Sequence, residues 1–171
     1  DFSTVHRLPW EDLRLSDVKI LSRAGEFPSQ GAVKEGFSFS QEWRSDDLEP
    51  LQEMVAEIAE VSQYRALFGR EVALKLYHKW LWNSLTGEVA DHCFIVRSEI
   101  NGKPAGLVAV KMEGEIAEAT LVAAGKEYRG TGTGRFLLSN VLFRLGELGA
   151  RSCLVATQIT NRSALRFYNS L

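Results

Sequence analysis

The feature that most constrains the fold of this chain is a glycine-rich run, RGTGTGR, at positions 129–135. An alternating apolar segment precedes this run, and a helical apolar pattern follows it: Leu137, Val141, Leu145 and Leu148. Glycine interrupts regular structure and can adopt backbone conformations that other residues avoid. The pattern therefore predicts a strand, a tight turn and a helix in direct succession. Such a unit is typical of an α/β domain.

The same run predicts an anion-binding site. The first amides of a helix lack intrahelical partners, and the helix dipole places positive potential there. Three glycines, Gly130, Gly132 and Gly134, would let an anion approach the backbone. Thr131 and Thr133 would add hydroxyl donors, and Arg129 and Arg135 would add positive charge. A turn that serves only tight packing is the alternative. The P-loop pattern fails, because Gly134 is followed by Arg135 and Phe136 where Lys and Ser or Thr are required. The dinucleotide pattern G-x-G-x-x-G fails, because after Gly130 and Gly132 it requires glycine at position 135.

The remaining pattern predicts one domain with a mixed sheet, in which a short strand near 18–21 precedes elements of order β-α-α-β-β-β-α-β-α. Strands are expected near 18–21 and at 37–43, 92–100, 105–113, 115–124 and 152–159, with a hairpin at Asn101-Gly102. Helices are expected from 48 to 61 after a cap at Asp46 or Asp47, from 71 to 85, from 132 to 148, and from 161 onward. The apolar stripes of the first two helices are predicted as Leu48, Leu51, Met54, Val55, Ile58 and Val61, and as Val72, Leu76, Trp80 and Leu85.

Composition places the chain among ordinary soluble globular proteins, with 45% apolar and 25% charged residues. The net charge of -2 argues against general nucleic-acid binding. From Lys126 onward, seven basic and two acidic residues give +5, which leaves -7 for the rest and favours a local anionic ligand. No apolar run approaches the ~18 residues of a membrane span. Cys93 and Cys153 lie in apolar runs and are expected to be buried free thiols. The chain shows no signal peptide and begins at Asp1, which fits a fragment of a cytoplasmic protein.

Two motifs together resemble the GCN5-related N-acetyltransferases (GNAT). Arg129-x-x-Gly132-x-Gly134 matches the family's [QR]-x-x-G-x-[GA] motif, and Asn161-x-x-Ala164-x-x-x-Tyr168 matches its second cofactor motif. The resemblance covers about 37–171 and implies the GNAT fold, a mixed, mostly antiparallel sheet flanked by helices. Residues 1–36 would be an N-terminal extension, a remnant of a small accessory domain. Residues 37–171 would form the acetyltransferase domain without the last C-terminal strands that the family normally adds.

A narrower resemblance concerns the acceptor. The segments YHKWLWNSLTGEVADHCFIVR and VATQITNRSALRFYNSL look similar to enzymes that acetylate a dTDP-4-amino-4,6-dideoxy sugar, such as dTDP-fucosamine acetyltransferases. The acceptor would then be a small nucleotide-linked amine. A peptide N-terminus, a polyamine or an antibiotic remains open, as does a coenzyme A sensor without turnover. Neither nucleic acid nor membrane is an expected partner, and a homodimer is expected only from family habit.

The resemblance also implies roles for individual residues. The amides of Arg129 to Gly134 would hold the pyrophosphate of acetyl-coenzyme A, and backbone groups of Leu121, Val122, Ala123 and Ala124 would meet the pantetheine arm. Asn161 would bond the cofactor, cap its helix, or do both. Tyr168 would protonate the leaving thiolate, with core packing as its alternative. Glu118, where some members carry a catalytic glutamate, is equally well a solvated strand residue and stays outside the predicted catalytic set.

For the acceptor, the segment SQYRALFGR at 62–70 connects the first two helices, where the family builds its acceptor pocket. Tyr64 and Phe68 could stack on a base or sugar, while Arg65 and Arg70 could meet a diphosphate or remain solvated. The aromatic residues of the next helix, Tyr77, Trp80 and Trp82, are expected in the core. His78 and His92 are expected to be structural or solvated, and no metal-ligand spacing is present.

Overall fold

The computed structural model describes residues 17–23, 27–158 and 161–170. Its strands are β1 (Asp17–Arg23), β2 (Phe37–Ser40), β3 (His92–Ser98), β4 (Pro104–Glu113), β5 (Ile116–Ala124) and β6 (Ser152–Gln158). Its α-helices are α2 (Leu48–Val61), α3 (Gln63–Phe68), α4 (Arg70–Leu85), α5 (Thr133–Glu147) and α6 (Arg162–Tyr168), and the 3-10 turns are η3 (Ser45–Asp47) and η4 (Lys126–Tyr128). This order confirms the prediction, except that the expected connection at 62–70 contains the short helix α3.

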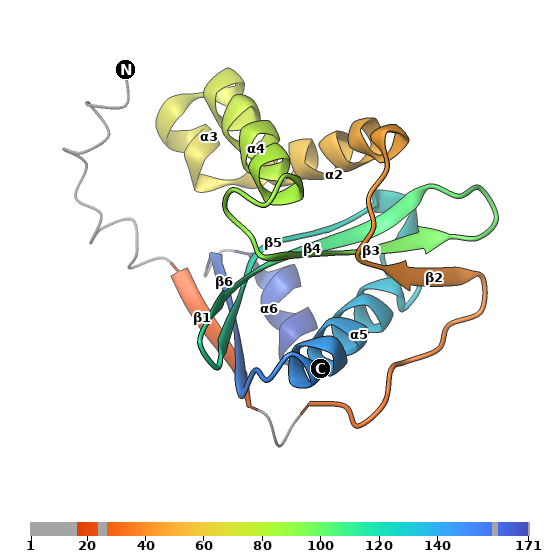
Figure 1. The fold of residues 1–171 in the computed structure, drawn as a ribbon. Helices are drawn as coiled ribbons and strands as arrows, with labels where there is room; N and C mark the ends of the chain where they lie inside the picture. The colour runs from red at the N-terminus through yellow and green to blue at the C-terminus, as the bar shows by residue number, and fades with distance from the viewer. Residues whose placement is uncertain (1–16, 24–26, 159–160, 171) are drawn as a thin grey trace.

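The described strands form one mixed sheet of order β1-β6-β5-β4-β3-β2. All neighbouring strands are antiparallel apart from β5 and β6, which run parallel. Helices α2, α3 and α4 cover one face and helices α5 and α6 cover the other (Figure 1). Because side chains alternate along a strand, Cys93 and Ile95 of β3 join the core under α2 and α4, whereas Phe94 and Val96 join the core under α5. The predicted fold class, a mixed, mostly antiparallel sheet flanked by helices, is therefore confirmed (Figure 1).

Strand β1 belongs to this sheet although it comes from the segment predicted as an extension. The strand expected near 18–21 is confirmed, and it pairs with β6 from Asp17↔Gln158 to Arg23↔Ser152. It thus covers the outer edge of β6 along the whole length of β6. The domain boundary at residue 36 remains a prediction, and residues 1–16 lie outside the described residues.

The buried faces of α2 and α5 largely follow the predicted stripes. Leu51, Met54 and Val55 of α2 are buried, whereas Val61 at its end is 75% exposed. The predicted core residues of α5 are likewise buried, but the prediction for Leu148 was wrong, because this residue is the C-cap of α5 and is exposed.

The predicted face of α4 was partly wrong: Leu85 is buried and Trp80 packs half-buried against the core, as predicted, but Val72 is not buried. Ala73, Tyr77 and Leu81 point into the core, together with Leu85, while Val72 is 52% exposed. One residue corresponds to about 100° around a helix, so an error of one position selects a different face. Alanine at 73 gives a weak hydrophobic signal beside Val72. Tyr77 lies in the core as expected, but Trp82 is 46% exposed and does not.

Both cysteines are free and buried, as predicted. Burial raises the pKa of both thiols to about 11. For Cys153, a backbone hydrogen bond from Ala119 lowers the pKa but does not offset burial. Neither thiol is therefore a reactive nucleophile near neutral pH.

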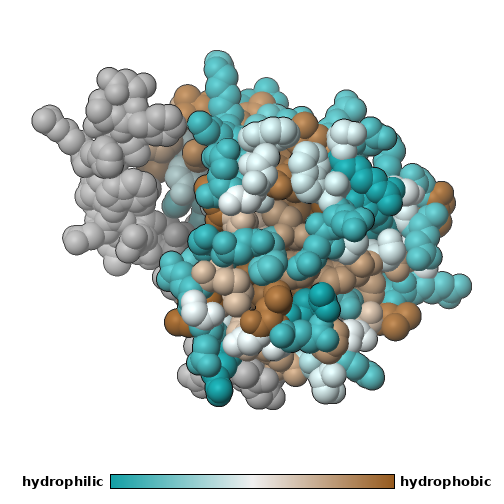
Figure 2. All heavy atoms as spheres, in the orientation of Figure 1, coloured by the Kyte–Doolittle hydropathy of each residue, from teal (hydrophilic) through white to brown (hydrophobic). Residues whose placement is uncertain are grey.

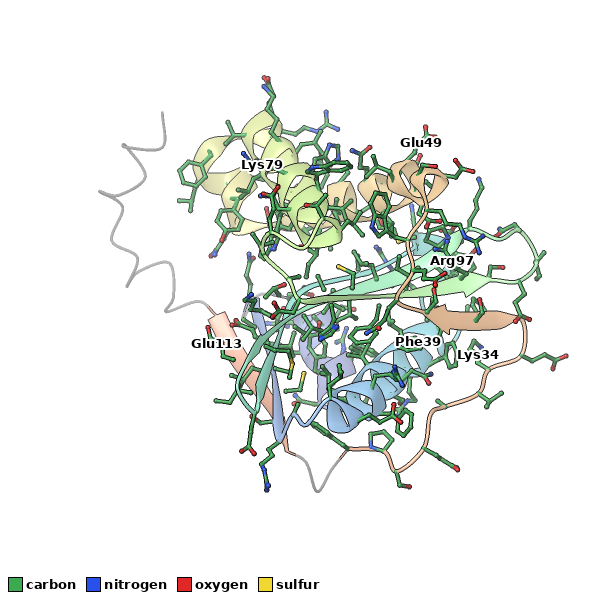
Figure 3. The ribbon with its side chains drawn as sticks, in the orientation of Figure 1. Lys34, Phe39, Glu49, Lys79, Arg97 and Glu113 are labelled. Atoms are coloured by element: carbon green, nitrogen blue, oxygen red, sulfur yellow. The ribbon has the colours of Figure 1, made fainter. Side chains whose placement is uncertain are left out.

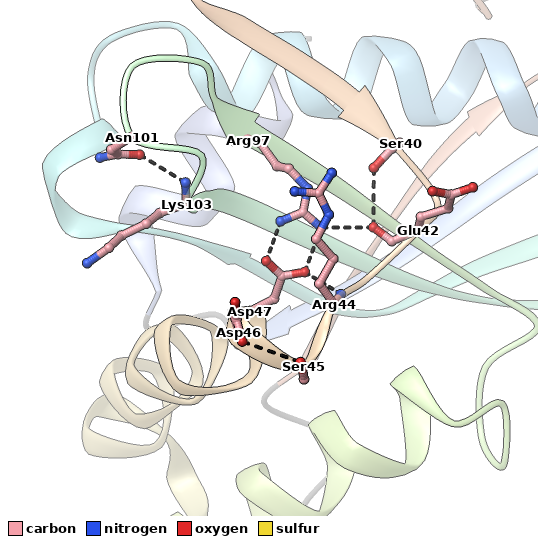
Figure 4. Close-up of polar contacts among 9 residues, drawn as sticks. All are labelled: Ser40, Glu42, Arg44, Ser45, Asp46, Asp47, Arg97, Asn101 and Lys103. Carbon is pink, nitrogen blue, oxygen red and sulfur yellow. Dashed lines mark hydrogen bonds and ion pairs between the residues drawn. The ribbon is translucent and has the colours of Figure 1, made fainter.

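A buried ion pair joins the start of α2 to β3 (Figure 4). The Arg97 guanidinium donates to both carboxylate oxygens of Asp47 and to the Glu42 carbonyl, the last at 2.9 Å. Asp47 also accepts from the Arg44 amide at 2.6 Å. It is the N-cap residue of α2, one of the two positions predicted, but its side chain makes no capping bond to that helix. Burial raises the pKa of Asp47, but the bonds from Arg97 and Arg44 outweigh burial, and the pKa lies below its usual value.

The molecular surface is mixed. On the face shown in Figure 2, hydrophilic residues dominate and apolar side chains reach the surface between them. Among the described residues, no helix combines the length and apolar character that a membrane crossing requires.

Candidate active site

The sheet opens where β5 and β6 separate. The two strands pair only from Ile116↔Ser152 to Ala119↔Val155, although both continue further. Thr120 is an extra residue in β5, because Ala119 pairs with Val110 and Leu121 pairs with Ala109 of β4. A bulge of this kind bends its strand. It therefore turns β5 away from β6 at the residue where their pairing ends.

A cleft of about 670 Å³ occupies this opening. Its volume is within the range of small-molecule sites. Its walls come from β5, β6, the C-terminal end of α2, the start of α3, one side of α4 and both ends of α6. The lining residues are Ile58, Val61, Ser62, Gln63, Tyr64, Tyr77, Trp80, Glu118, Ala119, Thr120, Leu121, Val122, Val155, Ala156, Thr157, Gln158, Asn161, Arg162, Ser163, Ala164 and Tyr168.

Tyr168 lies at the end of α6 and lines the cleft. Helix α6 starts at a local cap, because the Asn161 Oδ1 accepts a hydrogen bond from the Ala164 amide at 3.1 Å. Burial, together with the nearby Cys153 thiol, raises the pKa of Tyr168 to about 12. The phenol is therefore protonated at neutral pH and can act as a hydrogen-bond donor.

The glycine-rich run forms the turn into α5. Gly132 is the N-cap of α5 with φ 83°, a conformation that disfavours residues with a Cβ. The Phe136 amide makes the first bond, to the Gly132 carbonyl at 3.0 Å, so the amides of the preceding three residues lack intrahelical partners. Gly134 has a different role, since a Cβ there would lie 3.1 Å from the Phe167 ring. Glycine at this position lets α5 approach α6 next to Tyr168.

The polar side chains of this turn are directed largely to protein atoms. The Thr131 hydroxyl donates to the Tyr128 carbonyl at 2.7 Å and bonds the buried Thr133 hydroxyl at 2.8 Å. The Arg129 guanidinium donates to the Ala124 carbonyl at 3.1 Å and pairs with Glu57 of α2. The Arg135 guanidinium donates to the carbonyl of Ser170, just after α6. Both arginines thus hold the turn to neighbouring segments.

The predicted pantetheine residues divide into two pairs. Leu121 and Val122 line the cleft, whereas Ala123 and Ala124 continue β5 towards the turn. All four pair with β4 on one side of the strand. Their other side faces the gap that β6 leaves open.

The predicted acceptor residues also divide. Tyr64 lines the cleft and packs on Tyr77 with ring centroids 6.2 Å apart, and Tyr77 stacks on Trp80 at 5.8 Å. Phe68 stacks on Tyr64 at 6.5 Å but is outside the cleft lining. The structure therefore brings Tyr64, and not Phe68, to the same cavity as Tyr168.

Arg65 and Arg70 lie outside the cleft lining and both pair with Glu60. Trp80 packs half-buried against the core, as expected, and it also contributes to the cleft wall. Arg162 was missed, and no pattern around it marks a binding residue.

Glu118 is the carboxylate among the described residues that line the cleft. It lies on β5 opposite Leu154 of β6, with an exposed side chain. Neither His78 nor His92 lines the cleft. Within the described part of the chain, no three His, Cys, Asp or Glu side chains gather in an arrangement that could hold a metal ion.

Known proteins share this architecture. The family model described as "Acetyltransferase (GNAT) family" matches residues 52–171. No curated protein sequence shows significant similarity to the chain.

Solved structures agree with the family match. A GNAT-family acetyltransferase structure from Novosphingobium aromaticivorans is 20% identical with a TM-score of 0.55; the match covers 91% of this chain and 58% of that one. The PaiA N-acetyltransferase of Thermoplasma acidophilum, solved in complex with coenzyme A, is 18% identical with a TM-score of 0.60, over 78% of this chain and 87% of that one. The ribosomal-protein-S18-alanine N-acetyltransferase of Escherichia coli is 18% identical with a TM-score of 0.58, over 78% and 75%.

At these identities the structural likeness establishes the fold, and the family model establishes the relationship. The chain spans little more than half of the Novosphingobium protein. The separated parallel strands, the glycine-rich turn into α5 and the family match lead to one conclusion: the chain belongs to the GNAT family of acetyl-coenzyme A-dependent N-acetyltransferases.

Proposed function

We propose that this chain transfers an acetyl group from acetyl-coenzyme A to a primary amine bound in the cleft between β5 and β6. The observation that carries this proposal is the separation of the two strands after Ala119 and Val155, which opens a cavity with Tyr168 in its wall. The glycine-rich turn follows β5 after the short turn η4, so the strand that lines the cavity leads along the chain to the helix amides of α5.

The residues present fit the thioester substrate. The open side of β5 at Leu121 and Val122 offers backbone groups to an amide-containing arm, and the unpaired amides at the start of α5 suit a pyrophosphate. Asn161 is engaged as a helix cap through Oδ1, which leaves its amide nitrogen for a ligand. Acetyl-coenzyme A supplies the activated acetyl group.

The reaction needs three proton movements. A free alkylamine has a pKa of about 10.4, so it must lose a proton before its nitrogen can form the C–N bond. Glu118, directly or through water, accepts that proton. As the C–S bond breaks, the Tyr168 hydroxyl gives a proton to the thiolate, and its raised pKa keeps that proton available at neutral pH. The nitrogen, now bonded to the acetyl carbon, loses its second proton, which restores the Tyr168 hydroxyl.

The proposed acceptor is a nucleotide-linked amino sugar, a dTDP-4-amino-4,6-dideoxyhexose. The proposal rests on the sequence resemblance and on the aromatic wall of Tyr64, Tyr77 and Trp80, which suits a sugar or a base. The pairing of Arg65 and Arg70 with Glu60 instead favours an acceptor without a diphosphate, such as a peptide N-terminus. A coenzyme A sensor without turnover is the third candidate.

Thiol release from acetyl-coenzyme A across a panel of amines distinguishes these candidates. The panel contains dTDP-4-amino-4,6-dideoxyhexoses, peptides with free amino termini and polyamines, and calorimetry with coenzyme A is run in parallel. Preferred turnover of the nucleotide sugars would support the full proposal. Turnover of peptides or polyamines alone would overturn the acceptor, and binding without any turnover would favour the sensor. Absence of coenzyme A binding would overturn the proposed function.

A further inference from the structure

The loop before β2 brings a lysine to the glycine-rich turn. Residues 27–36 cross α5, where the Asn140 side chain donates to the Ala32 carbonyl at 3.2 Å. From this anchored loop, the Lys34 ammonium donates to the Thr131 carbonyl at 3.0 Å. It also lies 5.1 Å from the centre of the Phe37 ring. Lys34 thus reaches, across 97 positions of sequence, the centre of the turn that precedes α5.

The charge of this lysine remains available to a ligand. In the part of the chain that the structure describes, no carboxylate forms an ion pair with Lys34. An ammonium group has three donors, and the Thr131 carbonyl takes one of them. By contrast, Arg129 is paired with Glu57, and Arg135 is bonded to the Ser170 carbonyl. The charge of Arg129 is therefore offset by a carboxylate, and the guanidinium of Arg135 is directed to the segment after α6.

We propose that Lys34 binds the pyrophosphate of acetyl-coenzyme A and supplies positive charge at a turn whose own arginines are engaged elsewhere. This inference rests on the proposed function. Residue 34 precedes the region 52–171 that matches the family model, so the lysine belongs to this chain's own N-terminal segment. An ammonium is a compact point charge that suits phosphate oxygens, and the backbone amides of α5 complete the site.

Calorimetry with coenzyme A and the full chain tests this inference without knowledge of the acceptor. Lys34→Met removes the charge and keeps an unbranched side chain, and Lys34→Arg keeps the charge. Lys79→Met is the matched control, because Lys79 is exposed on α4, across the sheet from Lys34 (Figure 3). It changes the net charge by the same amount at a remote site.

We expect Lys34→Met to raise the Kd for coenzyme A about tenfold, as the loss of one charge-assisted bond implies. The Kd of this variant should also depend less steeply on salt than that of the wild type, because one screened charge contact is missing. Lys34→Arg should restore most of the affinity, and Lys79→Met should bind as the wild type does.

Other outcomes overturn the inference. An unchanged Kd in Lys34→Met would overturn it. Weaker binding in Lys34→Met with the wild-type salt dependence and no recovery in Lys34→Arg would also overturn it, because that result would indicate a purely structural contact with Thr131. Urea unfolding of each variant shows whether the fold is intact. If the wild type itself does not bind coenzyme A, both the proposed function and this inference are wrong.

Discussion

Tyr168 combines burial with access to the cleft, and burial sets its chemistry. Its ring packs beside Phe167, with centroids 5.4 Å apart, while the residue lines the cavity between β5 and β6. Because a phenolate would be poorly solvated there, the pKa of the hydroxyl rises to about 12. A group with such a pKa is a proton donor, and not a base, at neutral pH.

Replacing this hydroxyl tests its role. Tyr168→Phe keeps the ring and removes the donor, so we expect kcat to fall by about 100-fold or more. The Kd for coenzyme A should stay within about twofold, because the packing of the ring is preserved. Thiol-release kinetics on the best acceptor, with calorimetry beside them, measure both quantities. A kcat close to that of the wild type would show that another group protonates the thiolate.

At the scale of elements, the pair Asp47–Arg97 fixes the start of α2 against the sheet. Both side chains are almost completely buried, and Arg97 also donates to the Glu42 carbonyl. The far end of the same helix contributes Ile58 and Val61 to the cleft. The ion pair therefore helps to place one wall of the candidate active site.

Arg97→Met should lower the free energy of unfolding by about 3–5 kcal/mol, because it leaves the Asp47 carboxylate buried without its partner. Urea unfolding at neutral pH measures the loss. Arg144→Met, which breaks the exposed pair with Glu147, is the control and should cost at most about 1 kcal/mol. Equal losses in the two variants would contradict the assignment of Asp47–Arg97 as a buried structural pair.

At the scale of the whole molecule, three buried groups in the described part of the chain have a raised pKa. Cys93 and Cys153 rise from 9.0 to about 11, and Tyr168 rises from 10.0 to about 12, in each case chiefly because burial disfavours the charged form. In the unfolded chain these groups lose their protons at lower pH than in the fold. Rising pH therefore stabilises the unfolded state relative to the folded one.

We accordingly expect stability to be constant with respect to these groups below pH 9 and to fall as the pH rises towards 11 and 12. Urea midpoints measured at intervals above pH 8 follow the loss. A Cys93→Ala/Cys153→Ala variant starts from a lower stability but should lose less of it between pH 9 and pH 11. A slope identical to that of the wild type would show that the thiols do not contribute.

Local sequence patterns predict many structural features of this molecule. The glycine-rich turn, the cap at Asn161 and the stripe of Leu137, Val141 and Leu145 depend on residues a few positions apart. Local backbone geometry and helical periodicity determine such features, so the order of elements and the family resemblance could be predicted. Where the local signal was weak, as at Ala73 of α4, the predicted stripe missed a buried residue.

Tertiary structure alone decided the partners of the charged side chains and the shape of the site. The opening of the cleft depends on a bulge at Thr120 and on pairing between β5 and β6. Which arginines meet a carboxylate, and that Lys34 reaches Thr131, follow from segments that are distant in the chain. No periodicity encodes these contacts, because each depends on how the packed sheet and helices bring remote backbones together. The sequence by itself thus determined the family and the elements, while packing determined the cleft and its charges.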